Sequence, residues 1–123
     1  MPDSSEEPLA PEHIDRISAV VHAAMSAFKL ALGEAPLPVW ADAGADMQES
    51  TRAGVMFRLE NPHAAISAQH DQWMAERKAA GWVYGARKDV AARTHPSLVP
   101  YEELSRTERQ KDALFAAIVK ALS

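Results

Sequence analysis

The sequence contains no cysteine, which excludes disulfide bonds and metal sites that depend on thiolates. It also has no uninterrupted apolar run of the ~18 residues that a membrane span needs, so we expect no membrane insertion. Its first residues, MPDSSEEPLAPE, are acidic and contain proline, unlike a cleavable secretory leader. These absences favour a cytoplasmic protein.

A surplus of basic residues is missing as well. The chain has 13 Lys and Arg against 17 Asp and Glu, for a formal net charge of -4, which argues against binding to long nucleic acids. The basic side chains nevertheless gather in one part of the chain, at Arg77, Lys78, Arg87, Lys88 and Arg93. A local basic zone on an acidic protein suits a small anion, and a solvated charged face is the alternative.

Motifs for catalysis are also absent. The sequence has no GxxxxGK phosphate loop, no GxGxxG, no HExxH and no serine in a nucleophile-elbow pattern. Its five histidines show no recognisable metal-ligand spacing with carboxylates. We therefore expect no enzymatic activity, no metal and no cofactor.

The 123 residues are enough for one domain. We expect a flexible acidic tail over residues 1–11 and a single domain over residues 12–123. The apolar spacing predicts helices over residues 11–32, 46–59 and 67–80, and a fourth after Ser105. The prediction is a mainly α fold of about four helices, with a long structured loop over residues 81–101 that has room for a short β-hairpin.

Capping residues mark the ends of these helices. Gly33 and Gly81 are predicted to end the first and third helices, and Ser67 to cap the third. Ser105 and Glu108 form a capping box for the last helix. The residues predicted to face inward are Ile14, Ile17, Val20, Val21, Met25, Phe28 and Leu32, then Val55, Met56 and Leu59, and finally Leu114, Phe115, Ile118, Val119 and Leu122.

Gly54 lies inside the second predicted helix, where glycine costs about 1 kcal/mol relative to alanine. We therefore expect another group to pack closely against it.

An ordered set of residues begins at position 70. Its members are His70-x-x-Trp73, Lys78, Gly81-Trp82-x-Tyr84-Gly85, Asp89, His95-Pro96-x-Leu98-Val99-Pro100-Tyr101, Leu104 and Lys111-Asp112. The set resembles the RyR domain, the repeat of ryanodine receptors that also occurs as a single copy in bacterial and phage proteins. Upstream, His22, Pro38-Val39-Trp40, Ser50 and the LENP of residues 59–62 extend the resemblance to about residues 12–122. Asp71, where members often have glutamate, and Ala86, where many have proline, depart from the pattern.

The resemblance implies a compact helical fold with short strands and no catalytic chemistry. In the receptors the repeats pair with approximate twofold symmetry, and adenine nucleotides lodge between the two halves, flanked by tryptophans of the His-x-x-Trp elements. Carried onto this chain, that points to His70 and Trp73. A single-copy chain would need a second copy to supply the other half, so the resemblance implies a homodimer.

Aromatic and histidine side chains supply most of the candidate ligand contacts. Trp73 has polar neighbours three residues before it and four after it, so it could stack on a planar base at a boundary, or pack in the core. His70 is either a ligand hydrogen-bond partner or a structural one. Trp40, Trp82 and Tyr84 are further candidates, with core packing as the alternative for each.

Three cations in the same region, Arg77, Lys88 and Arg93, are candidate phosphate contacts, with free solvation as the alternative. His95 either donates a hydrogen bond to phosphate or ribose, or only fixes the loop together with Pro96. We expect Asp89 and Asp112 to partner backbone donors or nearby cations rather than a ligand.

The sequence thus favours a non-enzymatic module that binds a nucleotide or nucleotide-derived signal through an aromatic and basic pocket, in a homodimer. A structural or protein-interaction domain without a small ligand is the alternative. A hydrolase or transferase acting on nucleotides is a third hypothesis that no motif supports.

Overall fold

The computed structural model describes residues 10–123, so residues 1–9 of the predicted tail lie outside the described part of the chain. Four helices dominate the structure: α1 (Pro11–Ala31), α2 (Ala45–Glu60), α3 (Ile66–Ala79) and α4 (Arg106–Leu122). Short 3-10 turns, η2 (Trp40–Asp42) and η3 (Tyr101–Glu103), and two strands, β1 (Val83–Tyr84) and β2 (Thr94–His95), complete it. The prediction of a mainly α fold with four helices is confirmed.

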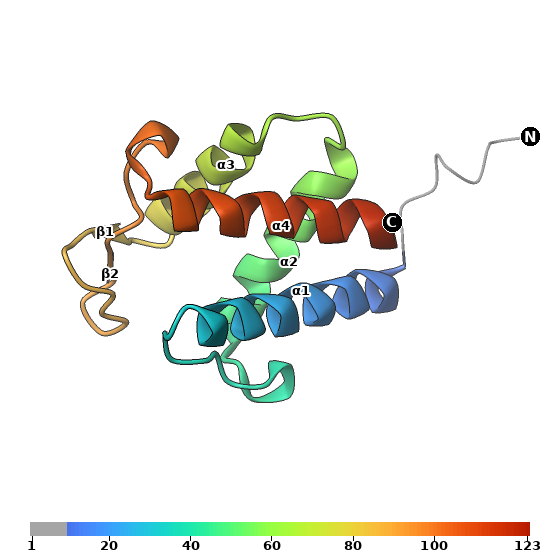
Figure 1. Ribbon diagram of the computed structural model, residues 1–123, viewed down its shortest axis with the longest axis horizontal. Coiled ribbons are helices and arrows are strands. Elements are labelled where there is room, and N and C mark those ends of the chain that lie inside the picture. The colour runs from blue at the N-terminus through green and yellow to red at the C-terminus, as the bar shows by residue number, and fades with distance from the viewer. Residues whose placement is uncertain (1–9) are drawn as a thin grey trace, which may run out of the picture.

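Helices α1 and α4 lie side by side and run in opposite directions, and α2 packs against α1, α3 and α4 (Figure 1). The centre of the core is formed by Ile17, Val21, Val55 and Val119, all fully buried. Because these four side chains come from α1, α2 and α4, the core holds together helices that are distant in the sequence.

Some side chains predicted to face inward do not. Val20, Leu32, Met56 and Leu122 are exposed, so the buried faces of these helices are narrower than the sequence predicts. On α1 the buried residues are Ile17, Ser18, Val21 and His22, so Ser18 and His22 take inward positions beside the two apolar residues. Ser18 is tolerated in the core because its hydroxyl donates to the Ile14 carbonyl at 2.8 Å.

The glycines at the helix ends behave as predicted. Gly33 and Gly81 have φ angles of 80° and 90°, in the left-handed region that favours glycine after a helix. The Ser105 hydroxyl accepts from the Glu108 N–H at 3.2 Å, which confirms that part of the capping box.

The prediction that Ser67 caps α3 is wrong, because the helix begins one residue earlier, at Ile66 after Ala65. The preceding turn is held by Arg58 instead. The guanidinium of this buried side chain donates to the carbonyls of Ala64 and Ala65 at 2.7 and 2.9 Å.

Strands β1 and β2 are parallel, with Val83 opposite Thr94 and Tyr84 opposite His95, so they do not form a hairpin. The chain between them curls back far enough for Asp89 to make an antiparallel bridge to Thr94. Gly85 is required where the segments meet, because a Cβ there would lie 2.5 Å from the Thr94 Cβ. This loop extends from the end of the helical body (Figure 1).

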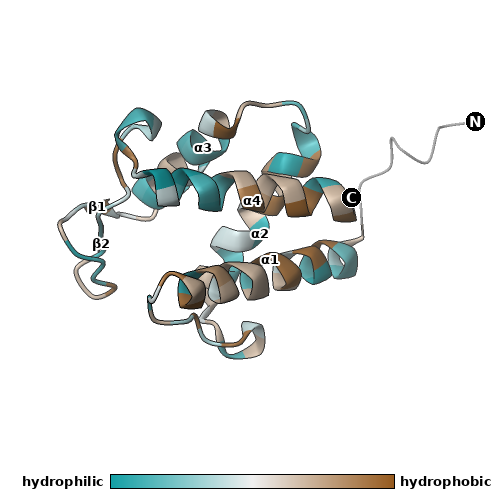
Figure 2. Cartoon of the chain, in the orientation of Figure 1, coloured by the Kyte–Doolittle hydropathy of each residue, from teal (hydrophilic) through white to brown (hydrophobic). Residues whose placement is uncertain are grey.

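Helix α4 changes character along its length, from a hydrophilic first half to a more hydrophobic second half (Figure 2). The second half supplies Val119 to the core, and the first half carries Glu108, Lys111 and Asp112. Over residues 10–123, none of the helices combines the length and the apolar character needed to cross a membrane.

Candidate functional site

Two cavities adjoin each other beside α3. The large cavity has a volume of about 420 Å³ and the adjoining cavity about 280 Å³. They share the walls Met25, Leu37, Ser50, Thr51, Trp73, His95 and Phe115. The large cavity is within the range of roughly 300–1,000 Å³ typical of small-molecule sites.

The predicted site residues divide between these spaces. The large cavity is lined by Trp73, Arg77, Trp82, Lys88 and His95, and the adjoining cavity by His70, Trp73 and His95. Trp40, Tyr84 and Arg93 line neither. The structure therefore brings six of the nine candidate residues together around the two adjoining cavities.

Trp73 lies where the two cavities meet. Its ring stacks on the His70 ring at 5.6 Å between centroids, and the His95 ring lies at 76° to it with centroids 5.0 Å apart. The indole is half-buried, and it lines both cavities. Because His70 covers part of one face, the remaining surface of Trp73 is what a planar ligand could contact.

His95 is oriented by its own loop. Its Nδ1 accepts from the Ser97 N–H at 3.0 Å, so the proton of the neutral ring is on Nε2. Burial, followed by the nearby positive charge of Lys88, lowers the pKa of His95 to about 4. At neutral pH this residue therefore offers an uncharged N–H donor at the junction of the cavities.

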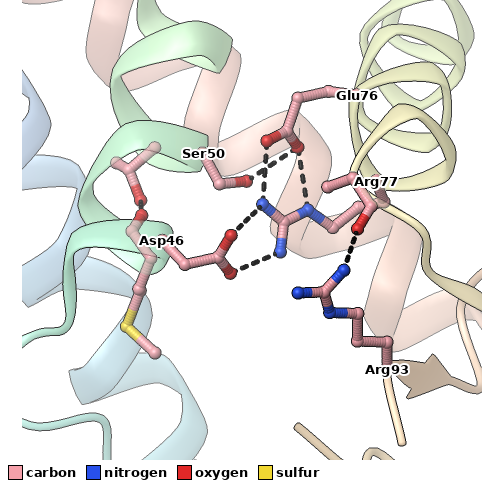
Figure 3. A network of polar contacts seen from close by, with 8 residues as sticks. Asp46, Ser50, Glu76, Arg77 and Arg93 are labelled. Atoms are coloured by element: carbon pink, nitrogen blue, oxygen red, sulfur yellow. Dashed lines mark hydrogen bonds and ion pairs between the residues drawn. The ribbon is translucent and has the colours of Figure 1, made fainter. Parts of the chain in front are cut away.

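Arg77 is committed to two carboxylates. It donates to the two Asp46 oxygens at 2.7 and 3.1 Å and to both Glu76 oxygens at 2.8 Å, so four N–H bonds converge on acidic partners (Figure 3). Its guanidinium also lies 5.3 Å from the centre of the Trp82 ring. The hydrogen bonds to Glu76 raise the pKa of Arg77. Arg77 is thus a buried structural centre whose charge is already balanced.

Lys88 differs from Arg77 because it makes no hydrogen bond or ion pair with any side chain of residues 10–123. Lys88 is an exposed residue, and its pKa is lowered by desolvation from neighbouring groups and then by the positive charges of Lys29 and Arg77. Arg93, the third predicted cation, has a φ of 55° and donates to the Ala80 carbonyl at 2.8 Å, beside the Arg77 network (Figure 3). Of the three, Lys88 is the cation left to attract an anion into the large cavity.

The other aromatic candidates differ in their surroundings. Trp82 is buried and forms a wall of the large cavity, whereas the Tyr84 side chain is exposed on β1. Trp40 meets the buried His22 ring edge-on at 5.3 Å, and Arg52 covers it at 5.4 Å.

His70 and Asp112 face each other in the adjoining cavity. The His70 Nε2–H donates to the Val99 carbonyl at 2.8 Å, and its Nδ1 lies 3.9 Å from the Asp112 Oδ2. That oxygen is buried and has no hydrogen-bond partner among residues 10–123, and burial raises the pKa of Asp112 to about 6. The prediction that Asp112 is satisfied by backbone donors or cations is therefore wrong, whereas Asp89 does accept from the Ala92 N–H at 3.1 Å.

Comparison with protein-family models gives a match to the RyR domain over residues 58–122, which is more than half of the chain. The chain belongs to the RyR domain family. The match begins within α2 and includes all of α3, the structured loop and all of α4.

In this RyR domain the cavity walls also come from residues upstream of the family match. Val21, His22 and Met25 from α1, and Met47, Ser50 and Thr51 from α2, line the large cavity. Sequence analysis did not assign these residues to the site, although His22 and Ser50 were part of the wider resemblance. The apolar members look like ordinary core residues in the sequence, so their role becomes visible only when the helices are packed.

Possible metal ligands do not converge in this RyR domain. Among residues 10–123, no three His, Asp or Glu side chains lie close enough together to hold a metal ion.

Proposed function

We propose that this RyR domain is a non-enzymatic binding module that captures a nucleotide or nucleotide-derived signal in the two adjoining cavities. One observation carries the proposal: Trp73, at the junction of the cavities, shares the large cavity with Lys88, a cation that no carboxylate of residues 10–123 pairs. An indole offers stacking to a base at ~1–3 kcal/mol, and a free ammonium group offers an attraction for phosphate.

The remaining walls suit such a ligand. Met25, Leu37 and Phe115 supply apolar surface, and Ser50 and Thr51 supply hydroxyl groups. His95 adds an uncharged donor for a ribose or phosphate oxygen. A mainly apolar space with a few polar groups at defined positions is the usual form of a small-molecule site.

We further propose that the domain acts as a cytoplasmic homodimer. Support comes from the paired repeats that the family resemblance implies, and from two exposed apolar side chains in the loop beside the large cavity. Tyr84 is 61% exposed and Val90, which also lines the large cavity, is 70% exposed. A second copy could cover these side chains and close the cavity.

A protein-interaction domain without a small ligand is the second candidate. It is favoured by the same exposed side chains, together with Val39 and Val83, which are 67% and 58% exposed. A partner protein could bury them as well as a second copy could.

Thermal unfolding of the purified protein against mono-, di-, cyclic and ADP-ribose-type nucleotides tests the proposal. A ligand at a hundred times its Kd stabilises the fold by about 2.7 kcal/mol, which shifts the midpoint by several degrees. We expect one nucleotide class to raise the midpoint of the wild type and not that of Trp73→Ala.

Trp40→Ala is the matched control, since Trp40 also packs beside a histidine but lines neither cavity. It should keep the nucleotide shift even if its own midpoint falls. If no nucleotide shifts the wild type, and a co-purifying protein is found instead, the interaction domain is the better description.

A further inference from the structure

We infer that the α2 wall of the large cavity selects the sugar of the ligand, because Asp46 accepts a hydrogen bond from a ribose hydroxyl group. The site would then distinguish ribonucleotides from their deoxy forms. The inference rests on the proposed function and adds to it the chemical class of the sugar.

Three polar side chains of α2 line the large cavity: Asp46, Ser50 and Thr51. Both hydroxyl groups have already used their hydrogens, because Ser50 donates to the Glu76 Oε2 at 3.3 Å and Thr51 to the Met47 carbonyl at 3.0 Å. An ionised carboxylate carries no hydrogen to donate. The polar part of this wall therefore offers a ligand only acceptors, and it needs a donor from the ligand.

Asp46 is held in a fixed orientation by Arg77, which bonds its two oxygens at 2.7 and 3.1 Å (Figure 3). These hydrogen bonds lower the pKa of Asp46, so the carboxylate is ionised at neutral pH. Each carboxylate oxygen can accept two hydrogen bonds, and Arg77 uses one on each. Because the Asp46 side chain is 62% exposed and lines the cavity, the remaining lone pairs are accessible to a ligand.

The loop side of the same cavity has the opposite polarity. Lys88 contributes an ammonium group and His95 an Nε2–H, and both are donors. A phosphate group has only acceptors at neutral pH, so it suits the loop side and is repelled by Asp46. A sugar hydroxyl can donate, so it suits the α2 side.

The order of parts in a nucleotide agrees with this division, since the ribose connects the base to the phosphate. Trp73 lies at the junction of the two cavities, and Lys88 lines the large cavity alone. A nucleotide that stacks on Trp73 and reaches Lys88 with its phosphate has its sugar in the large cavity, which is the cavity that Asp46 lines.

Isothermal titration calorimetry of the wild type tests the inference. The probes are AMP, GMP, CMP, UMP, ADP, cyclic AMP and ADP-ribose, each beside its 2′-deoxy form and, where the 3′-hydroxyl is free, its 3′-deoxy form. We expect the ribonucleotide that binds most tightly to lose roughly tenfold in affinity when one of these hydroxyl groups is removed. Fluorine at the same carbon, which cannot donate, should lower the affinity to the same extent.

Asp46→Ala assigns the effect to this residue. The variant should bind the ribonucleotide roughly tenfold more weakly and the deoxy form within about threefold of the wild type, so that the preference for ribose disappears. Glu49→Ala is the matched control, since Glu49 is an exposed acid of the same helix that lines neither cavity. It should keep the preference.

The outcomes separate the two proposals. Equal binding of ribose and deoxy forms by the wild type overturns this inference and leaves the proposed function standing. Equal losses for both forms in Asp46→Ala do the same, because Asp46 would then act only through Arg77. If that variant does not fold, the fluorine analogue decides, and binding as tight as that of the ribonucleotide overturns the inference. Failure of every probe to bind removes both proposals.

Discussion

Arg77 on α3 holds Asp46 on α2 through two hydrogen bonds of 2.7 and 3.1 Å, across 31 positions of the sequence. The Arg77 side chain is 7% exposed and that of Asp46 62%. The buried guanidinium thus connects α3 to α2, and its exposed partner Asp46 lines the large cavity.

Replacing Arg77 by alanine should lower the free energy of unfolding by about 2 kcal/mol, because four hydrogen bonds and the contact with Trp82 are lost. Arg77→Lys should not restore it, since an ammonium group cannot bond two carboxylates in a fork. Urea unfolding at pH 7 measures the change. Arg87→Ala is the control and should remain within about 0.5 kcal/mol of the wild type, as its side chain is exposed.

Lys88→Ala should weaken binding of a phosphorylated ligand by roughly tenfold, or about 1.4 kcal/mol, because no carboxylate among the described residues 10–123 pairs with this cavity cation. Binding of the corresponding nucleoside should change little. Calorimetry of both ligands checks this, with Arg87→Ala as a neighbouring charge control. Equal losses for nucleotide and nucleoside would show that Lys88 does not contact phosphate.

Gly54→Ala should destabilise the protein by about 1 kcal/mol. Alanine gains about 1 kcal/mol in helix propensity, but its Cβ would lie 2.9 Å from the Phe115 Cζ, and overpacking costs about 1–3 kcal/mol. Urea unfolding tests this directly. In the double variant with Phe115→Leu the methyl group should cost less than in the wild type, and a strictly additive result would contradict the steric explanation.

His95 and Asp112 should give opposite pH dependences of stability. Between pH 4 and 6.5 the unfolded state binds more protons at His95, so its contribution to stability is present above pH 6.5 and is lost as the pH falls toward 4. Between pH 3.8 and 6 the folded state binds more protons at Asp112, so its contribution is present at low pH and is lost as the pH rises toward 6.

Unfolding free energies of the wild type and two variants from pH 4 to 7 measure these slopes. Each group contributes at most about 1.4 kcal/mol per pH unit, and in the wild type the two partly cancel. Asp112→Asn should therefore lose stability in acid more steeply than the wild type, and His95→Gln less steeply. Identical slopes in all three proteins would refute the assignment.

Helices and their ends were largely predictable, because amphipathic spacing and glycine are local signals. The start of α1 at Pro11 and the left-handed Gly33 and Gly81 agree with the prediction. The close contact expected at Gly54 is confirmed, and its partner is Phe115 from α4. The parallel pairing of β1 with β2 was not predictable, because two-residue strands have no periodic pattern.

Within the site, the ordered motif from residue 70 identified the residues that meet around Trp73. The motif could not show which of these side chains form ion pairs or hydrogen bonds within the protein. Arg77 resembles a free phosphate ligand in the sequence, and its neutralisation by Asp46 depends on the packing of α2 against α3. Conversely, Asp112 resembles a structural carboxylate, and its unpaired oxygen follows from the position of His70.

The cavities have walls from both sides of residue 58, where the family match begins. A ligand there would contact α1 and α2 as well as α3 and the loop. It would therefore stabilise the packing of the upstream helices against the remainder of the domain. A fragment restricted to residues 58–122 would retain the motif and lose the cavity walls that α1 and α2 supply.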